Sequence, residues 1–315
     1  MNWIVDARLL HTRIVTRLLR KTVNASLEDN IFRMGAALAY YTLFSLAPLL
    51  LISVAVAGLV FGEKAAQGGI VSQIQGLIGD EGAQAVQTIM ASAHRPASGA
   101  FAGVLGVGVL ILGATGAFNE IYTALNNIWR TEPAGTHGAL SGAWSMVKAR
   151  LLSFGLVLVL GFLMLASLLV SALLSAIAKF AGTLIPVPPF LLNVAETVFT
   201  TIVLAALFAM IFRILPEKRI AWGDVWIGGL VTAVMFSLGK FLIGIYIGKS
   251  LPASSYGAAG SVIVLIAWIY YSALILYFGA EFTREYAEEF GSRSETVNAA
   301  EAASPERVTA RAHHA

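Results

Sequence analysis

Long apolar stretches separated by short polar breaks dominate the hydropathy pattern of this chain. Six stretches are long enough to cross a bilayer as a helix, which takes about 20 mostly apolar residues. They cover residues 34–60, 99–119, 150–175, 191–214, 222–247 and 260–283. Glycine, proline and charged residues fill the breaks, as in "RILPEKR" and "GKSLPASSYG". The pattern predicts an all-α, polytopic membrane bundle with six transmembrane helices.

The composition supports a membrane protein. Of the 315 residues, 57% are hydrophobic and only 12% are charged, whereas soluble domains carry roughly 25% charged residues. The mean hydropathy is +0.77. Cysteine is absent, which excludes disulfides, thiolate metal sites and a cysteine nucleophile.

Positively charged residues divide unevenly between alternate breaks. With six spans, sixteen of the twenty-one Lys and Arg residues fall on the side that holds both termini, and four fall on the other. Cytoplasmic loops carry the excess of Lys and Arg in membrane proteins. We therefore expect both termini to lie in the cytoplasm.

Three segments accompany the spans of the transmembrane domain, residues 34–285. Residues 1–33 are typical of a cytoplasmic basic amphipathic helix at the anionic inner leaflet, acting as an anchor or as a sensor of lipids or partners. Residues 61–98 predict an outer amphipathic segment of two short helices around "GDEG", either as cover or as a lid over a cavity. Residues 286–315 predict a disordered cytoplasmic tail, because they contain few large apolar residues.

One lysine interrupts the fifth apolar run, "VMFSLGKFLIGIYIG". A lysine at the bilayer centre costs about 2.5–3.5 kcal/mol on insertion scales, so a partner or a wet cavity is expected beside it. At a rise of ~1.5 Å per residue, Lys240 and Glu196 lie at similar depths below the outer edge. They are predicted either to pair beside an outward-facing cavity or to reach the interface separately.

A second group of polar residues gathers at the predicted inner edge of the bundle. It draws on four spans and contains Asn119, Glu120, Asn126, Asn127, Arg213, Asp224, Glu281 and Arg284. Two interpretations stay open. The group is either a solvated rim or the inner gate of a pathway, in which Arg213 is available to pair with Glu120 or Glu281.

The first span contains a proline in "LAYYTLFSLAPLLL". Pro48 removes a helical hydrogen bond, which predicts a kink near Phe44 with Tyr40 and Tyr41 on its cytoplasmic side. Such a kink either acts as a hinge for gating or simply shapes the helix.

Glycines four residues apart occur in the second and fifth spans. The pairs are Gly99 with Gly103 and Gly244 with Gly248. Small residues at this spacing let helix backbones approach closely. They predict tight packing within the chain, with dimerisation as the alternative.

Motifs for enzyme chemistry are sparse. The five histidines form no HxH or HExxH pair, and the sequence has no GxSxG motif and no Walker loop. Topology accounts for the basic residues, so no nucleic-acid groove is needed to explain them. We expect no enzyme activity, no cofactor or metal and no nucleic-acid partner. Membrane lipids are the expected partners, with a small solute or lipid as candidate substrate.

Five stretches of the chain resemble one known family. They are "AALAYYTLFSLAPLLL", "FNEIYTALNNIWR", "LPEKRIAWGDVWIGGL", "FSLGKFLIGIY" and "SYGAAGSVIVLIAWIYYSALILYFGAEFT". Over about residues 20–290 the chain resembles the YihY/BrkB family of bacterial inner-membrane proteins, which are often labelled ribonuclease BN or virulence factor BrkB. The residues that match the family motifs are Tyr40, Tyr41, Pro48, Asn126, Lys240, Tyr246, Tyr256, Gly257, Trp268, Gly279 and Glu281.

The resemblance implies a six-span bundle in the bacterial inner membrane with a link to envelope integrity. The leading hypothesis is transport or handling of a lipid or small solute, without an intrinsic ATPase. The pathway would use the inner polar group, Lys240, Tyr246 and Tyr256. The alternatives are a membrane scaffold that organises envelope partners and, third, a membrane-embedded hydrolase.

Overall fold

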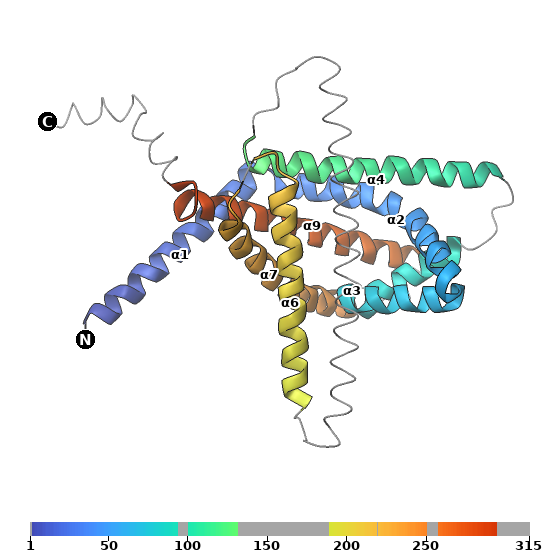
Figure 1. Ribbon diagram of the computed structural model, residues 1–315, viewed down its shortest axis with the longest axis horizontal. Coiled ribbons are helices and arrows are strands. Elements are labelled where there is room, and N and C mark those ends of the chain that lie inside the picture. The colour runs from blue at the N-terminus through green and yellow to red at the C-terminus, as the bar shows by residue number, and fades with distance from the viewer. Residues whose placement is uncertain (1, 94–99, 132–188, 219, 251–257, 295–315) are drawn as a thin grey trace, which may run out of the picture. The chain divides into compact units, whose positions relative to one another are not determined.

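Every regular element in the described part of the chain is an α-helix. The computed structural model describes residues 2–93, 100–131, 189–218, 220–250 and 258–294. The helices are α1 (Asn2–Glu28), α2 (Ile31–Phe61), α3 (Glu63–Ala93), α4 (Ala100–Ile128), α6 (Pro189–Ile214), α7 (Trp222–Ser250) and α9 (Ala258–Glu289), shown in Figure 1. The predicted helical fold class is confirmed for these residues.

Three of the described helices contain segments long and apolar enough to cross a membrane. These segments are Thr197–Ile214 in α6, Trp222–Ile243 in α7 and Val262–Glu289 in α9. A shorter apolar segment, Ile31–Leu46, lies in α2. The predicted third span, residues 150–175, lies outside the described residues. The count of six spans and the cytoplasmic placement of the termini therefore stay predictions.

The helices group into two compact units. The first unit contains α1, α6, the end of α4, the first part of α7 and the last part of α9. The second unit contains α2, α3, most of α4, the rest of α7 and the start of α9.

In the first unit, α7 and α9 interlock through two glycine–threonine pairs. A Cβ atom added at Gly228 would overlap the Oγ1 atom of Thr283, and one added at Gly279 would overlap the Oγ1 atom of Thr232. Each threonine hydroxyl donates to a carbonyl four residues back in its own helix, at 2.7 Å from Thr232 to Gly228 and 2.6 Å from Thr283 to Gly279. The hydroxyls are thus satisfied, and the two antiparallel backbones approach closely.

The same unit brings α6 against α7 at another glycine. A Cβ atom added at Gly229 would lie 2.5 Å from the carbonyl oxygen of Ala205 and 2.9 Å from the amide nitrogen of Ala209. Glycine is therefore required here by backbone-to-backbone contact. The pairs predicted from sequence, Gly99–Gly103 and Gly244–Gly248, lie outside the residues whose side-chain surroundings are described.

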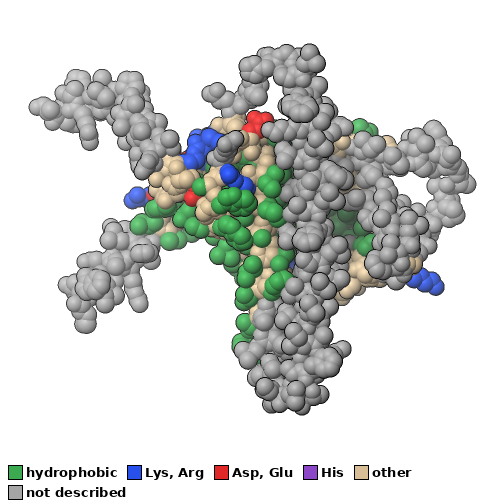
Figure 2. Space-filling model, viewed as in Figure 1, with side chains coloured by type: hydrophobic (Ala, Val, Ile, Leu, Met, Phe, Trp, Pro, Cys, Tyr) green, Lys and Arg blue, Asp and Glu red, His purple; other side chains and the backbone are tan. Residues whose placement is uncertain are grey.

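Apolar side chains line the exposed faces of α6 and α7. On α6 they recur every four residues, at Phe190, Val194, Val198 and Ile202. The series on α7 comprises Trp222, Trp226, Leu230, Val234, Leu238 and Phe241. Figure 2 shows hydrophobic side chains covering α6, while charged side chains gather around the end of α9. Large exposed apolar faces mark contact with lipid or another apolar surface, which agrees with a membrane location.

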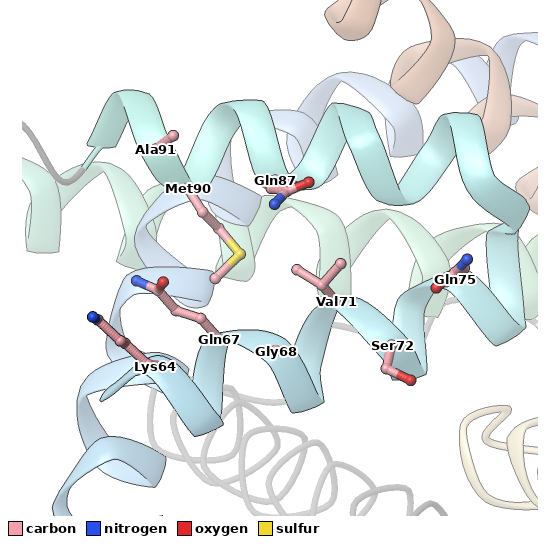
Figure 3. Close-up of a pocket in the computed structure, with 9 residues that line it drawn as sticks. All are labelled: Lys64, Gln67, Gly68, Val71, Ser72, Gln75, Gln87, Met90 and Ala91. Carbon is pink, nitrogen blue, oxygen red and sulfur yellow. The ribbon is translucent and has the colours of Figure 1, made fainter. Parts of the chain in front are cut away.

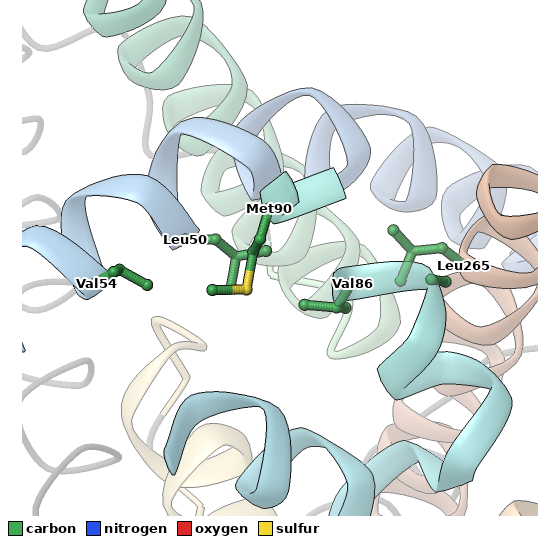
Figure 4. Packing of buried hydrophobic residues seen from close by; sticks show 6 residues of the cluster. Leu50, Val54, Val86, Met90 and Leu265 are labelled. Atoms are coloured by element: carbon green, nitrogen blue, oxygen red, sulfur yellow. The ribbon is translucent and has the colours of Figure 1, made fainter. Parts of the chain in front are cut away.

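The second unit has its own hydrophobic core where α2, α3 and α9 meet. Leu50 and Val54 of α2 pack with Val86 and Met90 of α3 and with Leu265 of α9, and all five are buried (Figure 4). A smaller cluster joins Ile243 of α7 to Val264 and Trp268 of α9. These contacts explain why α3 stays attached to the apolar helices although it is itself only moderately hydrophobic.

A buried ion cluster as the candidate functional site

Arg284 lies at the centre of a buried charged cluster near the end of α9. Its side chain is 2% exposed. The Nη2 and Nε atoms donate to Oε2 of Glu281 at 3.0 and 3.2 Å. Nη2 also donates to Oε1 of Glu285 at 2.8 Å, and Nη1 lies 3.5 Å from Oε2 of Glu288. One guanidinium group therefore meets three carboxylates.

Helix periodicity brings these residues together. Positions 281, 284, 285 and 288 lie three, four and seven residues apart, so they share one face of α9. Glu281 is fully buried. It sits between Gly279 and Thr283, the two α9 residues that interlock with α7. The close packing of α7 on α9 thus fixes the backbone that carries the cluster.

The turn after α1 adds a further carboxyl group to the cluster. The Asp29 side chain lies within hydrogen-bonding reach of the Glu281 carboxyl. Oδ2 of Asp29 and Oε1 of Glu281 are both buried, and neither receives a hydrogen bond from a donor within the described residues. Two carboxyl groups in contact repel each other when both are ionised, and a shared proton relieves that repulsion. If both were ionised, Asp29 and Glu281 would repel each other across this contact.

Ion pairs at the periphery connect α1 to the same region. The Lys21 ammonium lies 3.0 Å from Oε2 of Glu289, and Nη1 of Arg17 lies 3.9 Å from Oε1 of the same residue. Nη2 of Arg130 lies 3.9 Å from Oε2 of Glu28. The cationic side chains in these pairs are more than half exposed, so each pair contributes little to stability. They orient α1 without burying further charge.

Lys218 extends the cluster to the loop after α6. Its ammonium donates to the carbonyl oxygen of Trp129 at 3.1 Å. Burial lowers the pKa of the Lys218 ammonium, and the positive charge of Arg293 lowers it further, whereas Glu288 raises it. Lys218 in this loop therefore interacts electrostatically with charged residues at and beyond the end of α9.

Three residues predicted for the inner polar group anchor loops in this unit. Nη1 of Arg213 donates to the carbonyl oxygen of Ile220, and its guanidinium lies 5.7 Å from the centroid of the Trp222 ring. Oδ1 of Asn126 accepts from the amide of Glu217 at 3.0 Å. Oδ2 of Asp224 accepts from the amide and hydroxyl of Ser292 at 3.2 and 2.7 Å. These contacts give all three a structural role, and a role in a pathway stays a prediction.

Asp224 offers a direct test of this anchoring. Asp224→Ala removes the acceptor for both bonds from Ser292, so we expect a loss of about 1 kcal/mol in the free energy of unfolding. Asp224→Asn keeps an oxygen acceptor and should lose less. The thermal unfolding midpoint of the detergent-solubilised protein, followed by tryptophan fluorescence, measures both variants. Equal midpoints for wild type and Asp224→Ala would contradict the anchoring role.

The predicted residues in the second unit are arranged differently. Tyr40 is exposed and makes an edge contact with Tyr41, with ring centroids 5.6 Å apart. The Tyr41 ring lies where a Cβ atom at Gly116 of α4 would be. Glu120 is partly buried on α4, and Lys240 is partly buried on α7.

Four predicted residues are not placed at the level of side chains. Pro48 lies within the continuous helix α2, and Glu196 and Tyr246 lie on α6 and α7, but their side chains lie outside the described part. Tyr256 lies outside the described residues altogether. The proposed kink, and the pairing of Lys240 with Glu196, stay predictions.

Sequence reasoning missed three members of the cluster, namely Asp29, Glu285 and Glu288. The spacing of charges in "EFTREYAEE" was a usable signal for the two glutamates, because it places both on the face of Arg284. Asp29 lies in the turn between α1 and α2, far from α9 in sequence, and no local pattern indicates its contact with Glu281. Within the described residues, no group of three or more His, Cys, Asp or Glu residues could hold a metal ion.

Comparison with known proteins places the chain in a family. The sequence profile of the family described as Virulence factor BrkB matches residues 22–304. Proteins named UPF0761 membrane protein are similar: one from Verminephrobacter eiseniae is 29% identical, covering 81% of this chain and 58% of its own length. Another from Psychromonas ingrahamii is 29% identical and covers 86% and 87%.

The chain spans less than two thirds of several of these relatives. A third, from Alkalilimnicola ehrlichii, is 28% identical over 82% of this chain but 56% of its own length. No solved structure matches the chain. The family match covers most of the sequence, including the helices that carry the ion cluster. The chain is therefore a membrane protein that belongs to the BrkB family.

Proposed function

We propose that this protein moves or handles a lipid or small solute in the bacterial inner membrane, with both termini in the cytoplasm. The observation that carries the proposal is the buried cluster around Arg284. Glu281 and Arg284 lie within the apolar segment Val262–Glu289, and ionisable groups inside such segments are costly and mark substrate, ion or proton pathways. No ATPase or other enzyme activity is part of the proposal, because the sequence offers no motif for one.

The carboxyl pair gives this site a means of coupling to a proton gradient. Asp29 lies in the turn after α1 and Glu281 lies on α9, and their carboxyl groups approach each other away from solvent. Gain or loss of a shared proton would change the repulsion between α9 and the turn that follows α1. A change in the position of α1 would then accompany protonation.

Transport across vesicles of purified protein tests the proposal. Movement of lipid is followed with fluorescently labelled phosphatidylglycerol and a quencher added outside the vesicles. Movement of protons is followed with a pH-sensitive dye sealed inside the vesicles. We expect protein-dependent movement of the labelled lipid, of protons, or of both. Glu281→Gln should reduce that movement toward the rate of protein-free vesicles, because the amide cannot share the proton. Glu217→Gln alters an exposed carboxylate and serves as the matched control.

A membrane scaffold is the second candidate, and one observation favours it. Val15, Leu19, Val23 and Leu27 form an exposed apolar stripe along α1. The stripe lies beside the buried face that carries Leu18, so it is free to meet lipid or a partner helix. Vesicles that move neither probe, with protein that is folded and correctly inserted, would favour the scaffold over transport.

A further inference from the structure

Helix α3 borders an open hollow that includes no residue of the ion cluster. Figure 3 shows α3 doubling back, so that its first part faces its last part across a pocket of about 630 Å³. Volumes of roughly 300–1,000 Å³ are typical of sites for small molecules. The described residues that line the pocket all come from this one helix.

The base of the pocket is part of the hydrophobic core. Met90 lines the pocket and also belongs to the buried cluster with Leu50 and Val54. Val71 lines the pocket from the opposite arm and packs against the same cluster. The two arms of α3 are thus held to a common base, and the spacing between them is fixed by packing.

The remaining side chains give the pocket a specific chemistry. Gln67, Gln75 and Gln87 each carry a carbonyl acceptor and an amide with two donor hydrogens, and Ser72 carries a hydroxyl group. Lys64 adds a single positive charge at one end (Figure 3). Among the lining side chains that the structure describes, none is a carboxylate or an aromatic ring. A metal ion, an organic cation or a stacked base would therefore find little to bind.

This combination fits a ligand with several hydroxyl groups and one anionic group. Carboxamides match hydroxyl groups because each can donate and accept, and the ammonium pairs with a phosphate or carboxylate. We propose that the α3 pocket binds a phosphorylated polyol, either free in solution or as the head group of a phospholipid. The proposal does not depend on transport through the Arg284 cluster, because its test measures binding of the ligand and not its movement across the membrane.

Binding to the full chain in phosphatidylcholine nanodiscs provides the test. The soluble probe is glycerol 3-phosphate, with glycerol to show the contribution of the charge. The lipid probe is phosphatidylglycerol, added to detergent-solubilised protein and followed by native mass spectrometry against phosphatidylcholine. We expect Lys64→Met to weaken binding of the anionic probe about tenfold or more, whereas Lys64→Arg should retain most of it.

The glutamines supply a matched comparison within one helix. Gln87→Leu should weaken binding about fivefold, since it removes a donor and an acceptor from the pocket. Gln84 is exposed on the same helix but does not line the pocket, so Gln84→Leu should bind like the wild type. The side chains to be substituted, Lys64, Gln84 and Gln87, are all exposed on the helix surface. An unchanged thermal midpoint will show that each variant is folded.

The two probes separate the sources of the ligand. Binding of glycerol 3-phosphate supports a soluble ligand, and binding of phosphatidylglycerol alone supports a lipid head group. The proposal is overturned if neither probe binds, or if Lys64→Met and Gln87→Leu leave binding at the level of Gln84→Leu.

Discussion

Replacing Arg284 by methionine is expected to lower the free energy of unfolding by about 3–5 kcal/mol, which is the cost of removing one partner from a buried ion pair. The guanidinium group is 2% exposed and contacts Glu281, Glu285 and Glu288. Without it, three carboxylates and Asp29 remain close together with no cation at their centre. They must take up protons, move toward water or separate the helices.

Abundance in the membrane and the thermal midpoint in detergent both measure this effect. Arg33→Met is the matched control, because Arg33 is exposed and surface substitutions usually change stability by about 0.5 kcal/mol or less. A second variant separates charge from packing: Glu281→Gln in the Arg284→Met background removes one buried carboxylate. It should recover part of the lost stability, since the two residues are coupled.

An Arg284→Met protein with the abundance and midpoint of the wild type would contradict the buried cluster. A loss that Glu281→Gln does not reduce would instead assign the effect to the packing of the long arginine side chain. The double variant therefore distinguishes the electrostatic account from a purely steric one.

The apolar pattern predicted the helices well because each transmembrane helix is a local feature of the sequence. The predicted runs at 191–214 and 222–247 correspond to α6 (Pro189–Ile214) and α7 (Trp222–Ser250). Helix α4 continues to Ile128, beyond the predicted end at residue 119. Polar residues such as Glu120 and Asn126 lie between residue 119 and Ile128 and still have helical periodicity. Hydropathy alone cannot detect this part of the helix, because it recognises only apolar runs.

The contacts within the site could not be predicted in the same way. Asn126 was recognised as a polar residue at a helix end, but its partner is a backbone amide 91 residues away. The sequence leaves Arg213 available to pair with Glu120 or Glu281, and in the structure Nη1 of Arg213 donates to the carbonyl oxygen of Ile220. A sequence shows which groups need a partner, whereas only the packing of helices decides which partner lies within reach.

Close helix packing shows the same limit. A glycine four residues before another glycine is visible in sequence, whereas the observed interlock pairs Gly228 with Thr283 and Gly279 with Thr232. Threonine is one of the small residues found at helix contacts in membranes. Its hydroxyl bonds to its own helix, and the remaining atoms lie against a glycine on the neighbouring helix. Reciprocal pairing of this kind becomes visible only when both helices are in place.

Gly228→Ala should therefore destabilise the protein by about 2–3 kcal/mol, the upper part of the range for overpacking. The added methyl group would overlap Oγ1 of Thr283 and lie 2.7 Å from its Cβ atom. Because Thr283 lies on α9 beside Glu281, relief of the overlap must shift the helix that carries the ion cluster. Thermal unfolding in detergent measures the loss of stability, and the transport assay reports any displacement of the cluster.

The same helix supplies the control for this substitution. Gly223 has nothing within 4 Å of an added Cβ atom, so Gly223→Ala should leave stability almost unchanged or raise it slightly, because alanine favours the helix. Thr283→Ala removes the hydroxyl and methyl groups that the new side chain would meet. If the interlock is the cause, Gly228→Ala combined with Thr283→Ala should be more stable than the sum of the single losses predicts. Additive losses, or equal effects at Gly223 and Gly228, would show that the two helices do not interlock at these residues.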